Sequence, residues 1–173
     1  MTTRNKLIGA VSAVLALATL LVVVPQANAD GPFRIRNFGS NKCIQPHPGN
    51  PFGNDSPVVQ LPCNTNNIQK WTFTTNVKGT LSVVNLASGK CLNVSNNSTL
   101  RSPVVQFTCN TNSNQRWVPP TPRPNTVPKF FYSKVSGDTT CLDAKGDSSD
   151  FVQMQIYLCQ DDHPFTLWFV DAA

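Results

Sequence analysis

The chain contains no glutamate: all nine acidic residues are aspartates, and only 13% of its 173 residues are charged. Glycoside-cleaving enzymes generally need two carboxyl groups, one of which is kept protonated by its surroundings. The aspartates here lie mostly in turn sequences, and the adjacent Asp161 and Asp162 precede a His-Pro loop. The serine-nucleophile motif G-x-S-x-G is also missing. These absences indicate that the protein is not an enzyme.

Histidine is scarce, and the cysteines never occur as C-x-x-C. His47 and His163 both lie next to prolines, and we expect both in exposed loops. This composition argues against a zinc site or thiol redox chemistry, so we expect no metal and no cofactor. The basic residues are scattered singly instead of clustering with aromatic residues, which does not favour nucleic-acid binding.

Only one long hydrophobic run is present, and it lies at the N-terminus. Arg4 and Lys6 precede an uncharged Leu, Val and Ala run over 7–24, and Ala27-Asn28-Ala29 follows. A basic start, an apolar stretch and small residues at the cleavage positions are typical of a secretory signal peptide. A membrane anchor is the alternative, because the run is barely long enough to span a bilayer. We therefore expect residues 1–29 to be removed and the mature protein to be secreted, extracellular and free of the membrane.

Three cysteine pairs, each followed by a tryptophan, form a threefold repeat. First cysteines are 48 and 50 positions apart, second cysteines 46 and 50, and tryptophans 46 and 51. A period near 50 predicts one supersecondary unit used three times. We place the repeats at about 30–76, 77–128 and 129–173 of a single domain, 30–173, and expect a monomer.

Six cysteines in an exported chain indicate disulfides, for which fifteen pairings are possible. The repeat favours one pairing within each unit. The predicted bonds are Cys43–Cys63, Cys91–Cys109 and Cys141–Cys159.

Each repeat contains short runs of alternating or β-branched residues separated by Gly, Asn and Ser turns. This pattern predicts an all-β domain. The predicted strands lie at 33–38, 81–86 and 130–135, at 58–61, 104–107 and 154–157, and at 71–73 and 168–170. The proline-rich stretch 119–128 cannot supply ladder donors, and we interpret it as a long surface loop within the domain.

The repeat endings SPVVQLPCNTNNIQKW (56–71) and SPVVQFTCNTNSNQRW (102–117) resemble the ricin B-type lectin family. The resemblance covers the region after residue 29, apart from the proline loop. It implies a β-trefoil of twelve strands, with a six-stranded barrel capped by three hairpins. It also implies that Trp71, Trp117 and Trp168 are equivalent core residues.

The resemblance further implies one shallow sugar site per repeat. Such a site has an Asp two residues after the first cysteine, an aromatic ring two residues before the second, and polar residues near Q-x-W. Repeat 3 fits first, repeat 2 second, and repeat 1, with Gln45 and Leu61, should be silent. In repeat 3, Phe165-Thr166 replaces the usual Asn-Gln. The candidate ligand-binding residues are Asp143, Gln155 and Tyr157 in repeat 3, and Asn93, Phe107, Asn114 and Gln115 in repeat 2.

Each candidate also has a structural interpretation. Asp143 could cap its turn, Tyr157 and Phe107 could belong to the core, and Gln115, like Gln69, could bond the backbone. N-glycosylation sequons at Asn54, Asn93, Asn96 and Asn97 matter only in a eukaryotic secretory pathway.

The resemblance therefore predicts a non-catalytic lectin that binds galactose-type or xylan-type glycans. The alternative is a trefoil that has lost sugar binding and acts as a protein-binding or inhibitor module. The charge distribution does not decide between them, since residues 30–129 hold ten Lys and Arg against two Asp while 130–173 hold two against seven. This asymmetry could form a basic face toward anionic glycans or cell surfaces, but we favour the interpretation that it reflects solvated loops of opposite sign.

Overall fold

The computed structural model describes residues 31–95, 99–120, 127–135, 137 and 139–173. The expected signal peptide, most of the proline loop and the sequons at Asn96 and Asn97 lie outside these residues. All structural statements below concern the described part of the chain.

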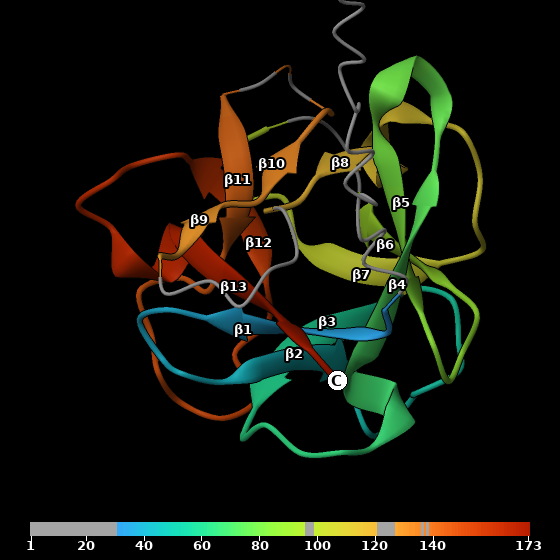
Figure 1. Cartoon of the computed structure of the whole chain (residues 1–173), viewed down its shortest axis with the longest axis horizontal. Helices are drawn as coiled ribbons and strands as arrows, with labels where there is room; N and C mark the ends of the chain where they lie inside the picture. Colours follow the sequence, from blue (N-terminus) through green and yellow to red (C-terminus); the bar gives the residue numbers. More distant parts are fainter. Residues whose placement is uncertain (1–30, 96–98, 121–126, 136, 138) are drawn as a thin grey trace, which may run out of the picture.

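Short strands, four or five in each repeat, account for most of the regular structure (Figure 1). Repeat 1 contains β1 (Phe33–Asn37), β2 (Cys43–Pro46), β3 (Ser56–Leu61) and β4 (Lys70–Thr75). Repeat 2 contains β5 (Leu81–Asn85), β6 (Cys91–Val94), β7 (Val104–Phe107) and β8 (Trp117–Val118). Repeat 3 contains β9 (Lys129–Phe130), β10 (Tyr132–Ser133), β11 (Thr140–Asp143), β12 (Gln155–Leu158) and β13 (Leu167–Ala172).

The helical segments are single 3₁₀ turns. They are η1 (Asn67–Gln69), η2 (Val77–Gly79), η3 (Ser113–Gln115) and η4 (Pro164–Thr166). Three of them directly precede the strand that carries the repeat's tryptophan. In the described ranges, no helix has the length and apolar character needed to cross a bilayer.

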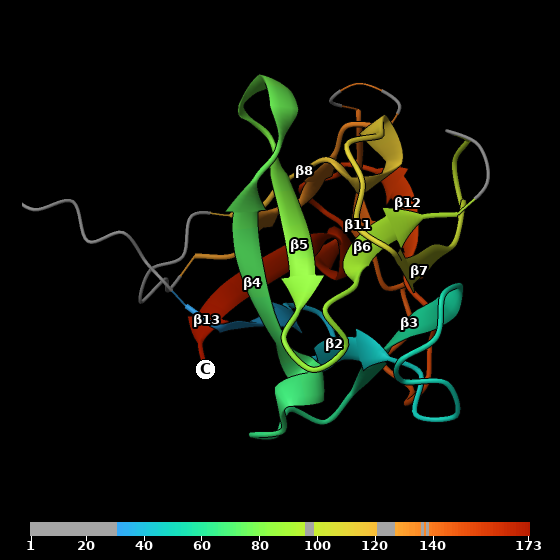
Figure 2. The ribbon, with the colours of Figure 1, turned by 90° about the vertical axis from the view of Figure 1, so that its right-hand side faces the viewer.

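Seven strand segments close into a barrel. β1 pairs with β13 and β4, β4 with β5, β5 with β8, β8 with β10, and β9 with β13. The remaining strands form one hairpin per repeat, β2–β3, β6–β7 and β11–β12. Figure 2 shows the long β4–β5 hairpin, which joins the first two repeats, standing beside these shorter ones. The all-β trefoil fold is therefore confirmed.

The strand count differs from the expected twelve because the first strand of repeat 3 is interrupted. β9 pairs with β13 and β10 pairs with β8, so the chain changes its barrel partner at Phe131. The Phe131 side chain is fully buried, and its ring lies edge-on to Trp117, with 5.7 Å between centroids. Burying this ring in the core explains why an aromatic residue stands at the break.

The three tryptophans are equivalent core residues, as predicted. Trp71, Trp117 and Trp168 are each fully buried. Each indole nitrogen donates to the backbone oxygen one residue after the first cysteine of its own repeat, at 3.1, 2.9 and 2.8 Å. A buried indole needs such an acceptor, and the repeated bond fixes each hairpin to the barrel.

The predicted disulfides are also confirmed. Their Cα–Cα distances are 4.9 Å for Cys43–Cys63, 5.0 Å for Cys91–Cys109 and 5.2 Å for Cys141–Cys159. In each hairpin the first cysteine lies opposite the residue two before the second cysteine, which is Leu61, Phe107 or Tyr157. Each disulfide therefore joins the two ends of one hairpin.

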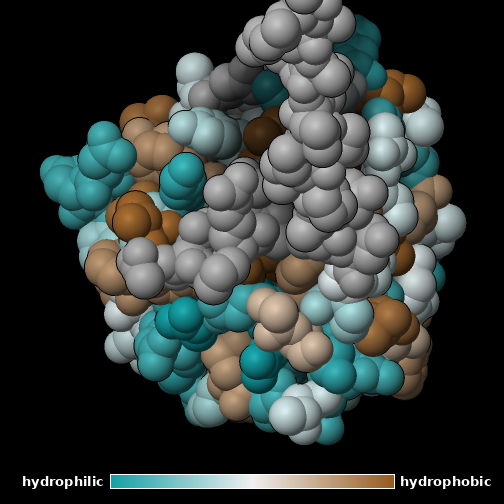
Figure 3. Space-filling view, in the orientation of Figure 1, coloured by the Kyte–Doolittle hydropathy of each residue, from teal (hydrophilic) through white to brown (hydrophobic). Residues whose placement is uncertain are grey.

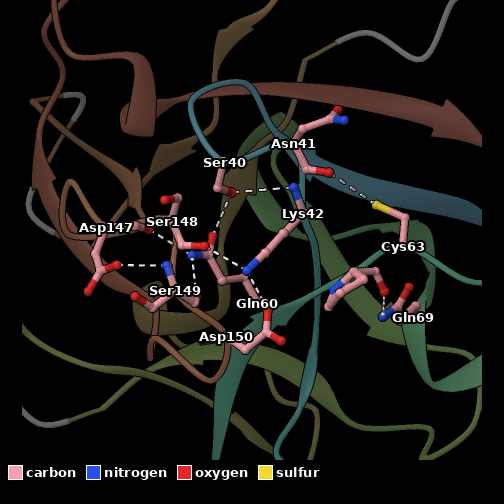
Figure 4. A network of polar contacts seen from close by, with 11 residues as sticks. Ser40, Asn41, Lys42, Gln60, Cys63, Gln69, Asp147, Ser148, Ser149 and Asp150 are labelled. Carbon is pink, nitrogen blue, oxygen red and sulfur yellow. Dashed lines mark hydrogen bonds and ion pairs between the residues drawn. The ribbon is translucent and has the colours of Figure 1, made fainter.

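The hairpin loops interlock from one repeat to the next. Gln60 of β3 is buried and donates from Nε2 to the backbone oxygens of Asp147 and Ser149, at 2.7 and 2.9 Å (Figure 4). Ser40 donates to Gln60 Oε1 at 2.7 Å. Gln106 of β7 holds the repeat 1 loop in the same way, through Pro51 O and Gly53 O. Each hairpin thus carries the loop of a neighbouring repeat.

The outer surface mixes polar and apolar residues. On the face shown in Figure 3, outside the grey atoms, apolar residues are scattered among hydrophilic ones. The largest exposed rings are those of Phe38, Phe52 and Phe151, at 47%, 62% and 53%. Isolated exposed apolar residues are normal for a folded domain and do not by themselves mark an interface.

Candidate ligand-binding site

A polar hollow of about 440 Å³ opens at the hairpin of repeat 3. Asp143 ends β11, and Gln155 lies directly opposite it at the start of β12. Tyr157 is two residues further along β12, so its side chain lies on the same face of the strand as that of Gln155. The structure therefore brings together the three residues that the sequence predicts for repeat 3. The lining is completed by Arg101, Lys145, Gln160 and His163.

Asp143 lies at the bottom of this hollow with only 1% of its surface exposed. Its Oδ2 accepts hydrogen bonds from Gln155 Nε2 at 2.7 Å and from the backbone NH of Lys145 at 3.0 Å. The second bond is the turn cap that the sequence offered as the structural interpretation. Among the described residues, its Oδ1 has no hydrogen-bond donor, and His163 Nδ1 lies 3.7 Å away. One carboxylate oxygen is thus satisfied and the other is not.

Burial raises the pKa of Asp143 above its ordinary value of 3.8. The hydrogen bonds from Gln155 and Lys145 oppose the shift, as do the charges of His163 and Lys145, but desolvation outweighs them. The unpaired oxygen therefore carries a cost that a donor entering the hollow would relieve.

Asp143 Oδ1 lacks a donor because repeat 3 differs in sequence from the other two repeats. In repeat 2, Gln115 Nε2 donates to Asn93 Oδ1 at 3.1 Å, and in repeat 1 Gln69 donates to Gln45 Oε1 at 2.9 Å. Repeat 3 has the shorter Thr166 at this position. Its hydroxyl donates to the backbone oxygens of Gln160 and His163, so this position supplies no donor to Asp143 Oδ1.

Aromatic rings form one side of the hollow. Tyr157 is partly buried, and its ring centroid lies 6.3 Å from that of His163, which in turn lies 5.9 Å from Phe165. The expectation that His163 lies in an exposed loop is wrong, because its side chain is only 31% exposed and faces Asp143. The turn into η4 brings it there.

The candidate residues of repeat 2 bond mainly to one another. Asn93 is 5% exposed, its Oδ1 accepts from Asn114 and Gln115, and its Nδ2 donates to Val94 O. Gln115 also donates to Thr108 O and accepts from the NH of Asn110. These are the bonds of the structural interpretation. Burial also leaves the Asn93 sequon nitrogen little access to solvent. Phe107 is partly buried at the end of β7.

Repeat 1 has neither a carboxylate nor a ring at the corresponding positions. Gln45 is 5% exposed and bonds to Gln69 and Pro46 O, and Leu61 occupies the place of Tyr157. The other histidine of the protein, His47, lies in repeat 1 and is partly buried, with its ring centroid 5.7 Å from that of Phe151. Among the described residues, the buried side-chain atoms without a hydrogen-bond partner are Ser56 Oγ in repeat 1 and Asp143 Oδ1 and His163 Nδ1 in repeat 3.

The sequence did not point to Arg101 as a site residue. It belongs to repeat 2, yet it lines the hollow of repeat 3, with its guanidinium carbon 5.8 Å from the centroid of the Tyr157 ring. Aligning the repeats places Arg101 beside Asp55, but only the interlocking of the loops reveals the contact. In the described part of the chain, no group of three His, Cys, Asp or Glu side chains is arranged to hold a metal ion.

A closed barrel capped by three disulfide-linked hairpins is the architecture of a β-trefoil. The family model for the ricin-type beta-trefoil lectin domain matches residues 31–164. The chain belongs to this family.

Solved structures share the fold. The designed threefold symmetric protein ThreeFoil is 20% identical with a TM-score of 0.71, and the match covers 82% of this chain and 98% of ThreeFoil. The ricin B-like lectin of Macrolepiota procera, solved in complex with lactose, is 17% identical with a TM-score of 0.69, covering 86% and 99%. The exo-β-1,3-galactanase 1,3Gal43A of Clostridium thermocellum is 19% identical with a TM-score of 0.73, covering 83% of this chain but 30% of the enzyme. No match was found among curated proteins.

Proposed function

We propose that this protein is a carbohydrate-binding module without catalytic activity, with its main site in the hollow of repeat 3. The observation that carries the proposal is the buried Asp143 Oδ1, which lacks a donor among the described residues. A sugar hydroxyl would supply that donor and form a charge-assisted hydrogen bond. Tyr157 beside it offers an aromatic face for the C–H side of a pyranose ring.

His163 limits access to this oxygen. Both Asp143 Oδ1 and His163 Nδ1 are buried and lack a hydrogen-bond partner among the described residues. At 3.7 Å the two atoms are too far apart for a hydrogen bond. A modest rotation of the partly exposed imidazole would open the carboxylate to a ligand hydroxyl. Because Thr166 stands where repeat 2 has Gln115, Asp143 Oδ1 can accept a hydrogen bond from a ligand. In repeat 2, Gln115 already donates to the corresponding oxygen, Asn93 Oδ1.

The composition of the hollow supports a role without catalysis. Asp143 is the one carboxylate among its lining residues, so it has no acidic partner for glycoside cleavage. We propose galactose-type glycans first and xylan-type glycans second. The lactose bound by the Macrolepiota procera lectin supports that order, since lactose contains galactose.

A single open hollow should bind weakly. Useful affinity would come from several modules meeting a repeated glycan. Repeat 2 is the second candidate site, but a ligand there must displace internal bonds of Asn93.

The test is binding of the oxidised protein to a glycan array and to insoluble polysaccharides, with Asp143→Ala compared with Asp161→Ala. Asp161 is exposed and does not line the hollow, so it controls for the loss of one negative charge. We expect Asp143→Ala to weaken binding by about tenfold or more, as for loss of a charge-assisted hydrogen bond. Unchanged binding in a protein carrying both Asp143→Ala and Asn93→Ala would refute the proposal.

A protein-binding or inhibitor role is the second candidate. It is favoured by repeats 1 and 2, whose polar groups at the candidate positions are bonded internally. Competition distinguishes the two functions: free monosaccharide should release a lectin from its target and leave a protein–protein contact intact.

We also propose that the protein is secreted. Arg4, Lys6, the apolar run 7–24 and the small residues 27–29 support this. N-terminal sequencing of protein recovered from the medium should begin at Asp30. Retention of residues 1–29 in a membrane fraction would contradict the proposal.

A further inference from the structure

Three residues with left-handed backbone conformations occupy equivalent places in the hairpin loops. They are Asp55, Arg101 and Phe151, with φ of 58°, 69° and 63°. Each precedes the second strand of its hairpin, where the loop packs on a neighbouring repeat. Arg101 N donates to Ile156 O at 2.8 Å, and Phe151 N donates to Gln60 O at 3.0 Å. The backbone role is shared, but the side chains are an acid, a base and an aromatic ring.

At the repeat 3 hairpin, the neighbouring loop comes from repeat 2 and contributes the basic residue of the three, Arg101. The Arg101 loop is fixed to β12 by two backbone bonds, Arg101 N to Ile156 O and Ile156 N to Ser102 O at 3.0 Å. Its guanidinium stands near the ring of Tyr157 and lines the hollow. Among the described residues, none accepts a hydrogen bond from this guanidinium. A cation is therefore held at the mouth of the hollow with its donors available.

Positive charge exceeds negative charge among the lining residues. Arg101 and Lys145 are exposed cations, and His163 adds a third when protonated. The single carboxylate, Asp143, is buried and has one oxygen already bonded. Asp161 and Asp162 lie in the adjacent loop and are exposed, but they do not line the hollow.

We infer that the hollow of repeat 3 prefers a sugar that carries an anionic group, a carboxylate or a sulfate. The inference rests on the proposed carbohydrate-binding function and names its ligand class. The ring packs against Tyr157, a hydroxyl donates to Asp143 Oδ1, and Arg101 donates to the anionic group. A guanidinium presents a planar pair of donors, which suits both carboxylate and sulfate oxygens.

The other two repeats provide an internal contrast. Asp55 stands at the place of Arg101 on the repeat 2 hairpin, where it would repel an anion. Phe151 stands there in repeat 1, beside His47. The preference for an acidic sugar therefore belongs to repeat 3 alone.

The test compares three ligands by calorimetry or NMR titration: methyl galactoside, methyl galacturonide and a sulfated methyl galactoside. We expect one or both acidic sugars to bind roughly fivefold tighter than the neutral one, as for a charge pair partly exposed to water. The difference should shrink at high salt. Whichever acidic sugar shows it identifies carboxylate or sulfate as the recognised group.

Variants assign the preference to Arg101. Arg101→Asn removes the charge with a residue that tolerates the left-handed conformation, and it should abolish the preference, so that this variant binds the acidic and the neutral sugars with equal affinity. Arg101→Lys should keep most of it. Lys78→Asn is the matched control, because Lys78 also has a positive φ of 57° and does not line the hollow. It should behave as the unmodified protein does.

The outcomes separate this inference from the proposed function. Equal binding of neutral and acidic sugars, or a preference that persists in Arg101→Asn, overturns the inference and leaves sugar binding standing. A preference lost equally in Lys78→Asn would also overturn it, because the effect would then reflect overall charge. No binding of any of the three sugars, or binding that survives Asp143→Ala, counts against the proposed site itself.

Discussion

At the scale of single residues, the difference between the repeats comes down to whether an amide reaches one oxygen. In repeat 2, Gln115 donates a hydrogen bond to Asn93, which lies two residues after the first cysteine. In repeat 1, Gln69 donates to Gln45 at the same position. Thr166 is too short to do so and bonds the backbone instead. Repeat 3 also has Asp143 where the other repeats have an amide side chain, and Gln155 donates to only one of its oxygens. The other oxygen has no donor among the described residues, and it makes repeat 3 a candidate site.

Asp143 should make folding stability depend on pH in a specific direction. Because burial raises its pKa in the folded protein above the ordinary 3.8, the folded state binds this proton more tightly than the unfolded state does. Its contribution to stability is fully present below about pH 3.8 and is lost as the pH rises through the raised value. Asp143→Asn, which cannot ionise, should therefore be more stable relative to the unmodified protein at pH 7 than at pH 4.

Urea denaturation at several pH values between 4 and 7 measures this difference. Subtracting the variant from the unmodified protein cancels the other titrating groups, including Asp147, whose pKa is lowered by its bonds to Ser149. Asp161→Asn, at an exposed position, should show no such trend. A stability difference that is constant with pH, or that favours the unmodified protein as the pH rises, would contradict the prediction.

At the scale of elements, the hairpin loops couple the repeats. Gln60 holds the loop 147–149 of repeat 3, and Lys42 bonds Ser148 O at 2.6 Å and contacts Asp150 (Figure 4). This loop lies in the chain between Asp143 and Tyr157. A hydrogen-bond network in repeat 1 therefore supports the geometry of the repeat 3 site.

Gln60→Ala should destabilise the fold and loosen the site. It leaves two backbone oxygens without their donor at a fully buried position, at a cost of about 1–3 kcal/mol. Hydrogen exchange should rise in loop 147–150, and sugar binding at repeat 3 should weaken.

Gln106→Ala is the matched control, since Gln106 is equally buried and holds the loop at Pro51 and Gly53 instead. It should cost similar stability but leave the repeat 3 site intact. If both variants weakened sugar binding alike, the effect would be general destabilisation and the proposed coupling would be wrong.

At the scale of the whole molecule, the closed ring of strands makes the three repeats interdependent. β1 pairs with β13, so the first and last described strands are neighbours. The core is continuous across all three units. A unit of this kind should unfold in one transition, because no repeat can bury its apolar face alone.

Replacing any one tryptophan by phenylalanine should therefore destabilise the whole domain. Each loses a buried indole hydrogen bond and leaves space in the core, so we expect about 2–4 kcal/mol for Trp71→Phe, Trp117→Phe and Trp168→Phe alike. Circular dichroism and the fluorescence of the remaining tryptophans should report one coincident thermal transition. Separate transitions for separate repeats would show that the ring does not unfold as a unit.

Much of this architecture could be predicted from the sequence. The cysteine and tryptophan spacings predicted three equivalent units, and the disulfides and core tryptophans follow them. The predicted strands agree with observed ones apart from the break at Phe131, but the first strand of each hairpin (β2, β6 and β11) was not among them. The repeat is visible in the sequence because each unit packs the same kinds of side chain against the shared core.

The all-β class and the pairing of the cysteines could be predicted from the residues alone, because they depend on local pattern and repetition. The resemblance to the ricin B-type lectin family implied the β-trefoil and the candidate hairpin positions. It also predicted Asp143, Gln155 and Tyr157 as neighbours. The tertiary structure alone decided that Arg101 of repeat 2 lines the hollow of repeat 3, that His163 faces Asp143, and that the amides of repeat 2 are engaged internally. Those facts depend on contacts between loops distant in sequence and on which oxygen a side chain can reach. A repeat pattern in the sequence predicts neither of these.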